Sequence, residues 1–393
     1  MEISEKNGKS FDKKNNNNSK YIKILNKKKK RIKTIFKTNL NNKEDEMKLN
    51  ENQNYIKNES KNNPENIEFF YDLIKDSFVN DTGLDNVFII FKSINNIFYL
   101  IYSNEFQSII SYNLIDNKKI NEIKNAHDFY INNFRHYLDK RNQRDLIISI
   151  SSWDNNIKLW NINNWEFLYD FKNIYKNGEL YSACFLKDNN ELYIIASNDN
   201  YPEKPGPVKV YNLKGKKIKT LNDSIERTFF IDTYYDNKFS KNYVLTGNQN
   251  YIKSYDYFNN KEYHKYSDNK YQYHCCILVI NTEEVTKLME SGDYEIRVWN
   301  FHSGELLKKI IIDINNKIRL CCICLWNNDY LFVGCNDRTI KLINLKNDKI
   351  VKSLTGHNGD LLTIKKIYHP LYGECLISKG DQGDTIKLWN IDN

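Results

Sequence analysis

The chain has 393 residues, of which 40% are hydrophobic, with 28 Tyr and 20 Phe. This length suits one large repeat domain with a tail or two ordinary domains, and the apolar content provides a sizeable core. The net charge of +8 belongs to one end, because residues 1–61 carry 17 Lys/Arg against 8 Asp/Glu and the remainder carries 41 against 42. A nearly neutral remainder argues against a basic nucleic-acid-binding fold.

Cysteine usage and hydropathy restrict the class of protein further. Most of the eight cysteines stand in apolar, strand-like runs, which favours buried reduced thiols over a disulfide framework or a zinc site. No apolar run approaches the ~18 residues of a membrane-spanning helix, and the first residues do not resemble a signal peptide. We therefore expect a soluble protein of the cytoplasm, with the nucleus as the alternative location.

Residues 1–62 are rich in Lys and Asn and poor in apolar residues. Such a segment buries too little apolar surface to offset the entropy lost on ordering, so we predict a basic disordered tail. Its most basic run fits a nuclear-import signal, a phosphate-binding arm for nucleic acid or an anionic membrane, or a solvated tail with a biased composition. That run consists of Lys27, Lys28, Lys29, Lys30 and Arg31.

Residues 63–85 allow two predictions. The sequence Asn63-Pro64-Glu65 is typical of the start of a helix, and the apolar residues at positions 67, 70, 74 and 78 follow at helical spacing. These signals predict a short amphipathic helix over 64–77. A strand through Glu68–Leu73 is the alternative.

From residue 86 to residue 393 the pattern changes to short apolar strands separated by turns rich in Asn, Asp and Gly. An aromatic or Ile anchor, usually followed by Asn, recurs at steps of 44 to 51 residues. Periods of this length predict seven four-stranded blades of a β-propeller. The anchors are Tyr112, Trp160, Tyr211, Tyr255, Trp299, Ile343 and Trp389.

The clearest copies of the repeat read Ile157-Lys-Leu-Trp160-Asn and Ile386-Lys-Leu-Trp389-Asn. With Asp154 six residues before Trp160 and Ser152 two residues before that Asp, about four-fifths of the chain resembles the WD40-repeat family. The resemblance implies an all-β fold, a seven-bladed WD40 β-propeller with four antiparallel strands in each blade.

In that family a His, a Ser or Thr, an Asp and the Trp form a buried chain of hydrogen bonds that ties the loops to the strands. A complete chain of this kind stiffens a blade. Blades one, three and four lack the His and the Asp and use Tyr as the anchor, so we expect their loops to be less rigid. The resemblance implies these network residues: His127, Ser152, Asp154, Trp160, Ser291, Asp293, Trp299, Asp337, His357 and Trp389.

The last blade lacks an outer strand, because only four residues follow Trp389. Propellers of the WD40 family usually take this strand from the N-terminal part of the chain, which removes a free sheet edge. Two segments fit that role, Phe69–Leu73 and Lys30–Phe36. The sequence leaves both open.

Four residues are candidates for contact with a partner. Trp153 stands in a turn directly before Asp154, where a large aromatic side chain projects from one face of the ring of blades. Tyr201 and Lys204 lie in the proline-rich turn 198–207, and Asp381 lies in the long turn 378–384. Local packing of Trp153 and tolerated insertions in the two turns are the alternatives.

Motifs for catalysis or for ligand binding are not found in the sequence. No G-x-S-x-G, H-E-x-x-H or phosphate-loop motif is present, and no two histidines stand at H-x₃₋₅-H spacing. We expect no catalytic residue, no metal and no cofactor. The predicted function is a non-catalytic scaffold, a monomer that joins other proteins in a multisubunit complex. The alternative is a nuclear or RNA-associated subunit that its basic tail holds on nucleic acid.

Overall fold

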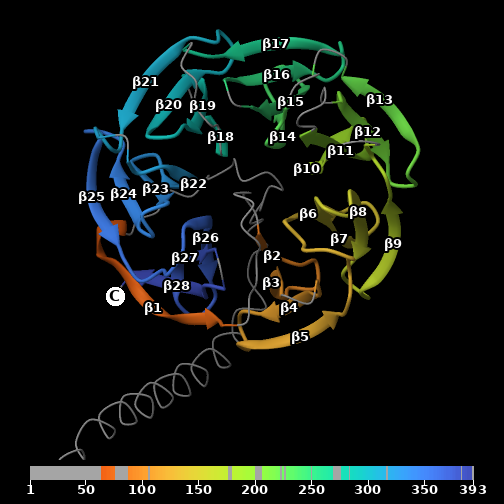
Figure 1. Ribbon diagram of the computed structural model, residues 1–393, viewed down its shortest axis with the longest axis horizontal. Coiled ribbons are helices and arrows are strands. Elements are labelled where there is room, and N and C mark those ends of the chain that lie inside the picture. Colours follow the sequence, from red (N-terminus) through yellow and green to blue (C-terminus); the bar gives the residue numbers. More distant parts are fainter. Residues whose placement is uncertain are drawn as a thin grey trace, which may run out of the picture. The chain divides into compact units, whose positions relative to one another are not determined.

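The chain divides into two compact units, residues 1–49 and 50–393, and the part that the structure describes belongs to the second unit. In a computed structural model this unit is a seven-bladed β-propeller of four-stranded antiparallel sheets (Figure 1). The predicted fold is therefore confirmed. The structure describes residues 63–75, 87–104, 107–175, 179–199, 206–221, 224, 227–248, 250–268, 276–282, 284–315, 317–381 and 383–391.

The strands of each blade follow one another along the chain, except in blade 7. Blade 1 comprises β2 (Phe88–Lys92), β3 (Phe98–Ser103), β4 (Ile109–Asn113) and β5 (Lys118–Ile123), and blade 2 comprises β6 (Asn133–Asp139), β7 (Arg144–Ser151), β8 (Asn156–Asn161) and β9 (Glu166–Phe171). Blade 3 comprises β10 (Glu179–Asp188), β11 (Glu191–Asp199), β12 (Val208–Asn212) and β13 (Lys217–Leu221), and blade 4 comprises β14 (Phe230–Asp236), β15 (Lys241–Gly247), β16 (Ile252–Asp256) and β17 (Lys261–Tyr266). Blade 5 comprises β18 (Cys276–Asn281), β19 (Thr286–Ser291), β20 (Glu295–Asn300) and β21 (Leu306–Ile311), and blade 6 comprises β22 (Leu320–Asn327), β23 (Tyr330–Cys335), β24 (Ile340–Asn344) and β25 (Lys349–Leu354). Blade 7 comprises β26 (Leu361–His369), β27 (Gly373–Gly380), β28 (Ile386–Ile391) and β1 (Ile67–Ile74).

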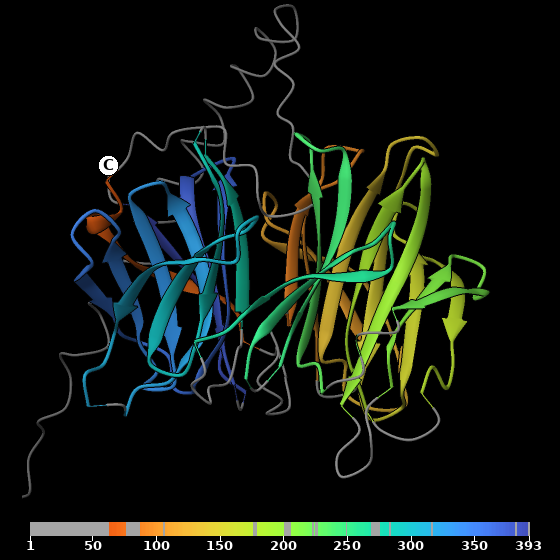
Figure 2. The same ribbon diagram turned by 90° about the horizontal axis from the view of Figure 1, so that it is seen from above.

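The first strand of each blade lies near the centre of the ring and the fourth lies at its perimeter (Figure 1). Because the strands alternate in direction, their turns gather at two faces of the ring (Figure 2). We call the face with the turns between second and third strands, and with the connections between blades, the connection face. The opposite face holds the turns between first and second strands and between third and fourth strands.

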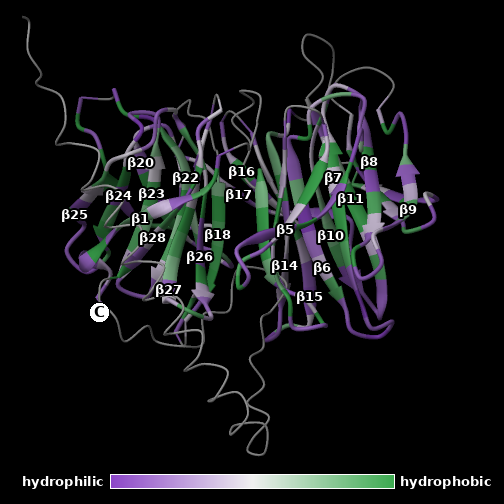
Figure 3. Cartoon of the chain, turned by 90° about the horizontal axis from the view of Figure 1, so that it is seen from below, coloured by the Kyte–Doolittle hydropathy of each residue, from purple (hydrophilic) through white to green (hydrophobic). Residues whose placement is uncertain are grey.

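The core lies between the blades. The described residues form seven apolar clusters, one between each pair of adjacent blades. Figure 3 shows the hydrophobic residues along the strands and hydrophilic residues in the turns. Each predicted anchor lies on the third strand of its blade, where alternation of side chains turns it toward these clusters. The packed clusters therefore hold the ring together.

The strand that completes blade 7 is β1, which pairs antiparallel with β28. The closing strand predicted at Phe69–Leu73 is confirmed, and the alternative candidate, Lys30–Phe36, lies outside the described residues. No helix among the described residues is long and apolar enough to cross a membrane.

The helix predicted over 64–77 is wrong. Only a short 3-10 helix, η1 (Pro64–Asn66), follows the Asn63 cap, whose side chain accepts the N–H of Glu65. The pairing with β28 has two irregularities, between Phe69 and Tyr71 and between Asp72 and Ile74. These irregularities break the alternation of a regular strand, and the resulting apolar spacing resembles that of a helix.

Polar contacts fix β1 in place at both of its ends. Near one end, Asp72 Oδ1 accepts the Thr385 hydroxyl and the Lys387 ammonium, each at 2.7 Å. Partial burial raises the pKa of Asp72, but these two hydrogen bonds outweigh it and hold the pKa below its ordinary value. At the other end, Tyr330 of blade 6 donates to Glu65 Oε1 at 2.7 Å. The closing strand is thus bound to two blades.

Candidate functional site

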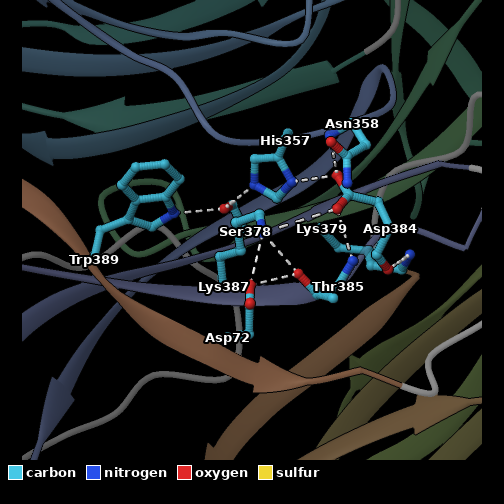
Figure 4. A network of polar contacts seen from close by, with 9 residues as sticks. All are labelled: Asp72, His357, Asn358, Ser378, Lys379, Asp384, Thr385, Lys387 and Trp389. Atoms are coloured by element: carbon cyan, nitrogen blue, oxygen red, sulfur yellow. Dashed lines mark hydrogen bonds and ion pairs between the residues drawn. The ribbon is translucent and has the colours of Figure 1, made fainter. Parts of the chain in front are cut away.

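Blade 7 contains a buried chain of hydrogen bonds that joins its entry loop to its third strand (Figure 4). His357 precedes β26, and its Nδ1 lies 2.6 Å from Asp384 Oδ2. Its Nε2 lies 2.6 Å from the Ser378 hydroxyl, which accepts the indole N–H of Trp389 at 2.7 Å. All four side chains are buried. The predicted residues His357 and Trp389 therefore meet through Ser378.

The partners fix the direction of each hydrogen bond in this chain. Although burial raises it, hydrogen bonds from His357 and from the amides of Asn358 and Thr385 lower the pKa of Asp384 to about 2, so its carboxylate accepts. Burial lowers the pKa of His357 and keeps its ring neutral. His357 then donates from Nδ1 and accepts the Ser378 hydroxyl at Nε2. Because every donor has an acceptor, the network stiffens the blade.

Blade 2 repeats this arrangement. His127 Nδ1 lies 3.0 Å from Asp154 Oδ2, and His127 Nε2 lies 2.8 Å from the hydroxyl of Ser149. The indole of Trp160 donates to the same hydroxyl at 2.9 Å. The structure thus brings together the predicted residues His127, Asp154 and Trp160.

The hydroxyl of the blade 2 network belongs to Ser149 and not to the predicted Ser152. Ile147 on β7 stands opposite Trp160, and side chains alternate along a strand, so Ser149 lies on the same face as the indole. Ser152 lies beyond the end of β7, and its buried hydroxyl has no hydrogen-bond partner in the described part of the chain. The prediction for Ser152 is wrong.

Blade 5 keeps the tryptophan but surrounds it with charges. The indole of Trp299 donates to Glu290 Oε1 at 2.8 Å, and Arg297 stands directly opposite Glu290 in the sheet. Arg297 is fully buried, and its Nε donates to Glu295 Oε1 at 2.7 Å. Its other nitrogens lie 3.6 Å from Glu290 and 3.4 Å from Asp268. Asp268 in turn pairs with Lys309 at 2.5 Å.

The sequence also predicts network roles for three other residues, Ser291 and Asp293 of blade 5 and Asp337 of blade 6. The buried hydroxyl of Ser291 has no hydrogen-bond partner among the residues that the structure describes, so that prediction is wrong. Asp293 lies in the turn between β19 and β20, where its carbonyl accepts the N–H of Leu320 at 2.8 Å. Asp337 accepts the Thr339 hydroxyl at 2.6 Å and pairs with Lys341 at 2.9 Å.

Blade 3 has a tyrosine at this place, which the sequence did not indicate as a network residue. Tyr175 is buried, and its hydroxyl donates to the carbonyl of Ala196 at 2.7 Å. Lys209 on the third strand donates to the carbonyl just before Tyr175, that of Ile174, at 2.7 Å. Burial raises the pKa of Tyr175 well above its ordinary value. A tyrosine therefore joins the entry loop to the strands of this blade.

An exposed aromatic pair lies on the connection face of blade 2. Trp153 in the turn between β7 and β8 is 60% exposed, and Phe129 in the connection before β6 is 45% exposed. Their ring centroids lie 6.2 Å apart. Asp154, next to Trp153, binds His127 and accepts the N–H of Asp128 at 3.3 Å. The buried network therefore fixes both segments that present the aromatic pair.

Another partner candidate, Asp381, is not exposed. Asp381 is only 5% exposed, and a Cβ placed on Gly359 would lie 1.9 Å from its Oδ1, so tight packing removes Asp381 from solvent. The prediction of Asp381 as a partner contact is wrong. Tyr201, Lys204 and the basic run Lys27–Arg31 lie outside the described residues.

A bound metal ion would need a cluster of acidic, His or Cys side chains. No group of three or more His, Cys, Asp or Glu side chains within the described ranges is arranged to hold a metal ion. Cys184, Cys335 and Cys375 are buried free thiols, and burial raises the pKa of Cys335 and of Cys375 to about 12.

No protein-family model matches the chain, and no curated protein matches it.

Proposed function

We propose that the chain is a WD40-type scaffold, a non-catalytic protein that binds another protein on its connection face and works within a multiprotein complex. The observation that carries this proposal is the aromatic pair, Phe129 and Trp153, exposed on a support that the His127 network makes rigid. Large aromatic side chains lose little conformational entropy on binding and are enriched at interface hot spots.

The networks support the WD40 part of the proposal. Blades 2 and 7 each contain a complete chain of the residue types that the resemblance implies, running from Asp through His and Ser to Trp. The same chains support a non-catalytic role, because both ring nitrogens of His127 and of His357 are engaged inside a blade. Buried thiols such as Cys184 support a location in the reducing cytoplasm or nucleus.

Affinity purification of the full chain from its native cell, followed by mass spectrometry, tests the proposal. We expect Trp153→Ala to lose at least one protein that the wild type retains, because truncation of a hot-spot residue weakens binding by about 2 kcal/mol. Tyr368→Ala is the matched control, since Tyr368 is 64% exposed near the end of β26, on the opposite face. If Trp153→Ala and a Tyr201→Ala/Lys204→Ala variant both retain every wild-type partner, the proposal fails.

A further inference from the structure

Blade 4 presents a second group of exposed aromatic rings, on the opposite face of the ring of blades. Phe258 is 82% exposed in the turn between β16 and β17, and Phe239 is 51% exposed in the turn between β14 and β15. Tyr235, at the end of β14, is 44% exposed. We call these three residues the blade 4 patch.

The two turns that carry the patch are held rigid by aspartates. Asp236 Oδ1 accepts the N–H of Lys238 at 2.8 Å and that of Phe239 at 3.2 Å. Asp256 Oδ1 accepts the N–H of Asn259 at 2.9 Å. Lys241 then joins the two turns, because its ammonium donates to Asp256 Oδ2 at 3.0 Å. Phe239 and Phe258 therefore stand on one rigid support, which reduces the entropy lost on binding.

The repeat itself does not require a phenylalanine at position 258. In five other blades the turn after the third strand is capped by an Asn side chain, which accepts the N–H of the residue two positions later. Phe258 is likewise the second residue after Asp256. The residues at this position in the other five blades are Ile115, Asn163, Lys214, His302 and Lys346. Four of these five residues are polar, so the turn does not require an exposed phenylalanine at this position.

The accessible charge of the two turns that carry the patch is positive. Lys238 and Lys261 are exposed, and neither forms an ion pair with another described residue. Lys219 donates to the carbonyl of Tyr257, next to Phe258. The carboxylates of the same two turns are withdrawn from solvent, with Asp236 2% and Asp256 5% exposed. A partner with negative charges beside an apolar side chain complements this surface.

We propose that the blade 4 patch binds an acidic segment of a second protein, in which a large apolar side chain contacts Phe239 and Phe258 while neighbouring carboxylates face Lys238 and Lys261. The blade 4 patch and the aromatic pair lie on opposite faces of the ring. The patch stands at the turns between β14 and β15 and between β16 and β17, whereas Trp153 stands at the turn between β7 and β8. The ring therefore joins two partners at once and holds them apart by the length of its strands.

Selection of binders from a random peptide library displayed on phage, with the full chain as the target, tests this proposal. We expect enriched peptides that carry Asp or Glu next to Phe, Leu or Trp. Phe258→Asn, which introduces the residue that blade 2 has at this position, should weaken their binding at least about tenfold in fluorescence anisotropy. Lys238→Glu should weaken it as well, and added salt should lower the affinity of the wild type.

Two controls distinguish binding at the blade 4 patch from binding elsewhere on the molecule. Trp153→Ala should bind the selected peptides as the wild type does, so the two surfaces are tested independently. Equal binding to the Phe258→Asn variant, or enrichment of peptides without acidic residues, overturns the proposal. So does self-association of the wild type that Phe258→Asn abolishes in sedimentation, or binding to phosphatidylserine vesicles that the same substitution abolishes.

Discussion

Blades 5 and 7 place a tryptophan at the same point of the repeat and bind it in different ways. In blade 7 the indole of Trp389 starts a chain of Ser378, His357 and Asp384 that contains one carboxylate. In blade 5 the indole of Trp299 donates to a fully buried glutamate within a cluster of charges. The anchor therefore does not specify its own network, which depends on the second-strand residue that faces the indole.

Breaking the charged cluster of blade 5 should have the largest effect. Arg297→Met leaves Glu290 buried without its opposing charge, which costs about 3–5 kcal/mol of the free energy of unfolding. Chemical denaturation measures this loss. Arg297→Met with Glu290→Gln should be at least about 1 kcal/mol more stable than the single variant, because the amide is uncharged and still accepts the indole N–H. A single variant that loses under about 1 kcal/mol would contradict the role assigned to Arg297.

The serine at the centre of each neutral network comes next. Ser378→Ala leaves the Trp389 indole and the His357 ring without their shared partner, so we expect a loss of roughly 2–4 kcal/mol in the free energy of unfolding. Ser149→Ala should behave similarly in blade 2. Ser152→Ala and Ser291→Ala are the matched controls, because their buried hydroxyls have no partner among the described residues. Comparable losses in all four variants would contradict the assignment of the hydroxyls.

A fall in pH should lower the free energy of unfolding through blade 7, by a smaller amount than the substitutions above. His369 of blade 7 donates from Nε2 to the carbonyl of Leu114 at 3.1 Å and accepts the N–H of Leu371 at Nδ1. Burial lowers the pKa of His369 from 6.5 to about 4. Between these values the unfolded chain binds a proton that the folded chain does not, so the free energy of unfolding decreases as the pH falls from 6.5 towards 4.

The measurement for this third prediction compares denaturation at pH 7 and at pH 5. The wild type should lose about 2 kcal/mol through this histidine, and His369→Gln should lose that much less over the same interval. Ile314→Ser changes an exposed side chain and no titratable group, so it should keep the slope of the wild type. An unchanged slope in His369→Gln would show that other groups carry the acid sensitivity.

The sequence was sufficient for features that depend on local pattern. All seven anchors occur on third strands, because one apolar side chain at this place packs between blades in every repeat. His127 and Asp154 were also predicted, since both lie near an anchor in the sequence and match the pattern of a known family.

Features that depend on register or on surface position were not predictable in the same way. Ser149 is recognised only when β7 is aligned with β8, and Arg297 becomes a partner of Glu290 only through pairing of two strands. Phe258 follows Tyr257, which is buried, so the sequence does not distinguish the exposed ring from the buried one. The two irregularities in β1 likewise exist only in its pairing with β28.

The closing strand also determines the order in which the molecule can assemble. Asp72 and Thr385 meet across 313 positions of the chain, and closing a flexible loop of that length costs about 5 kcal/mol of chain entropy. The cost falls once the intervening blades have formed and brought the two segments near each other. We therefore expect blade 7 to form last. Until then the apolar side of β1 has no partner, and contact with another newly made chain favours aggregation.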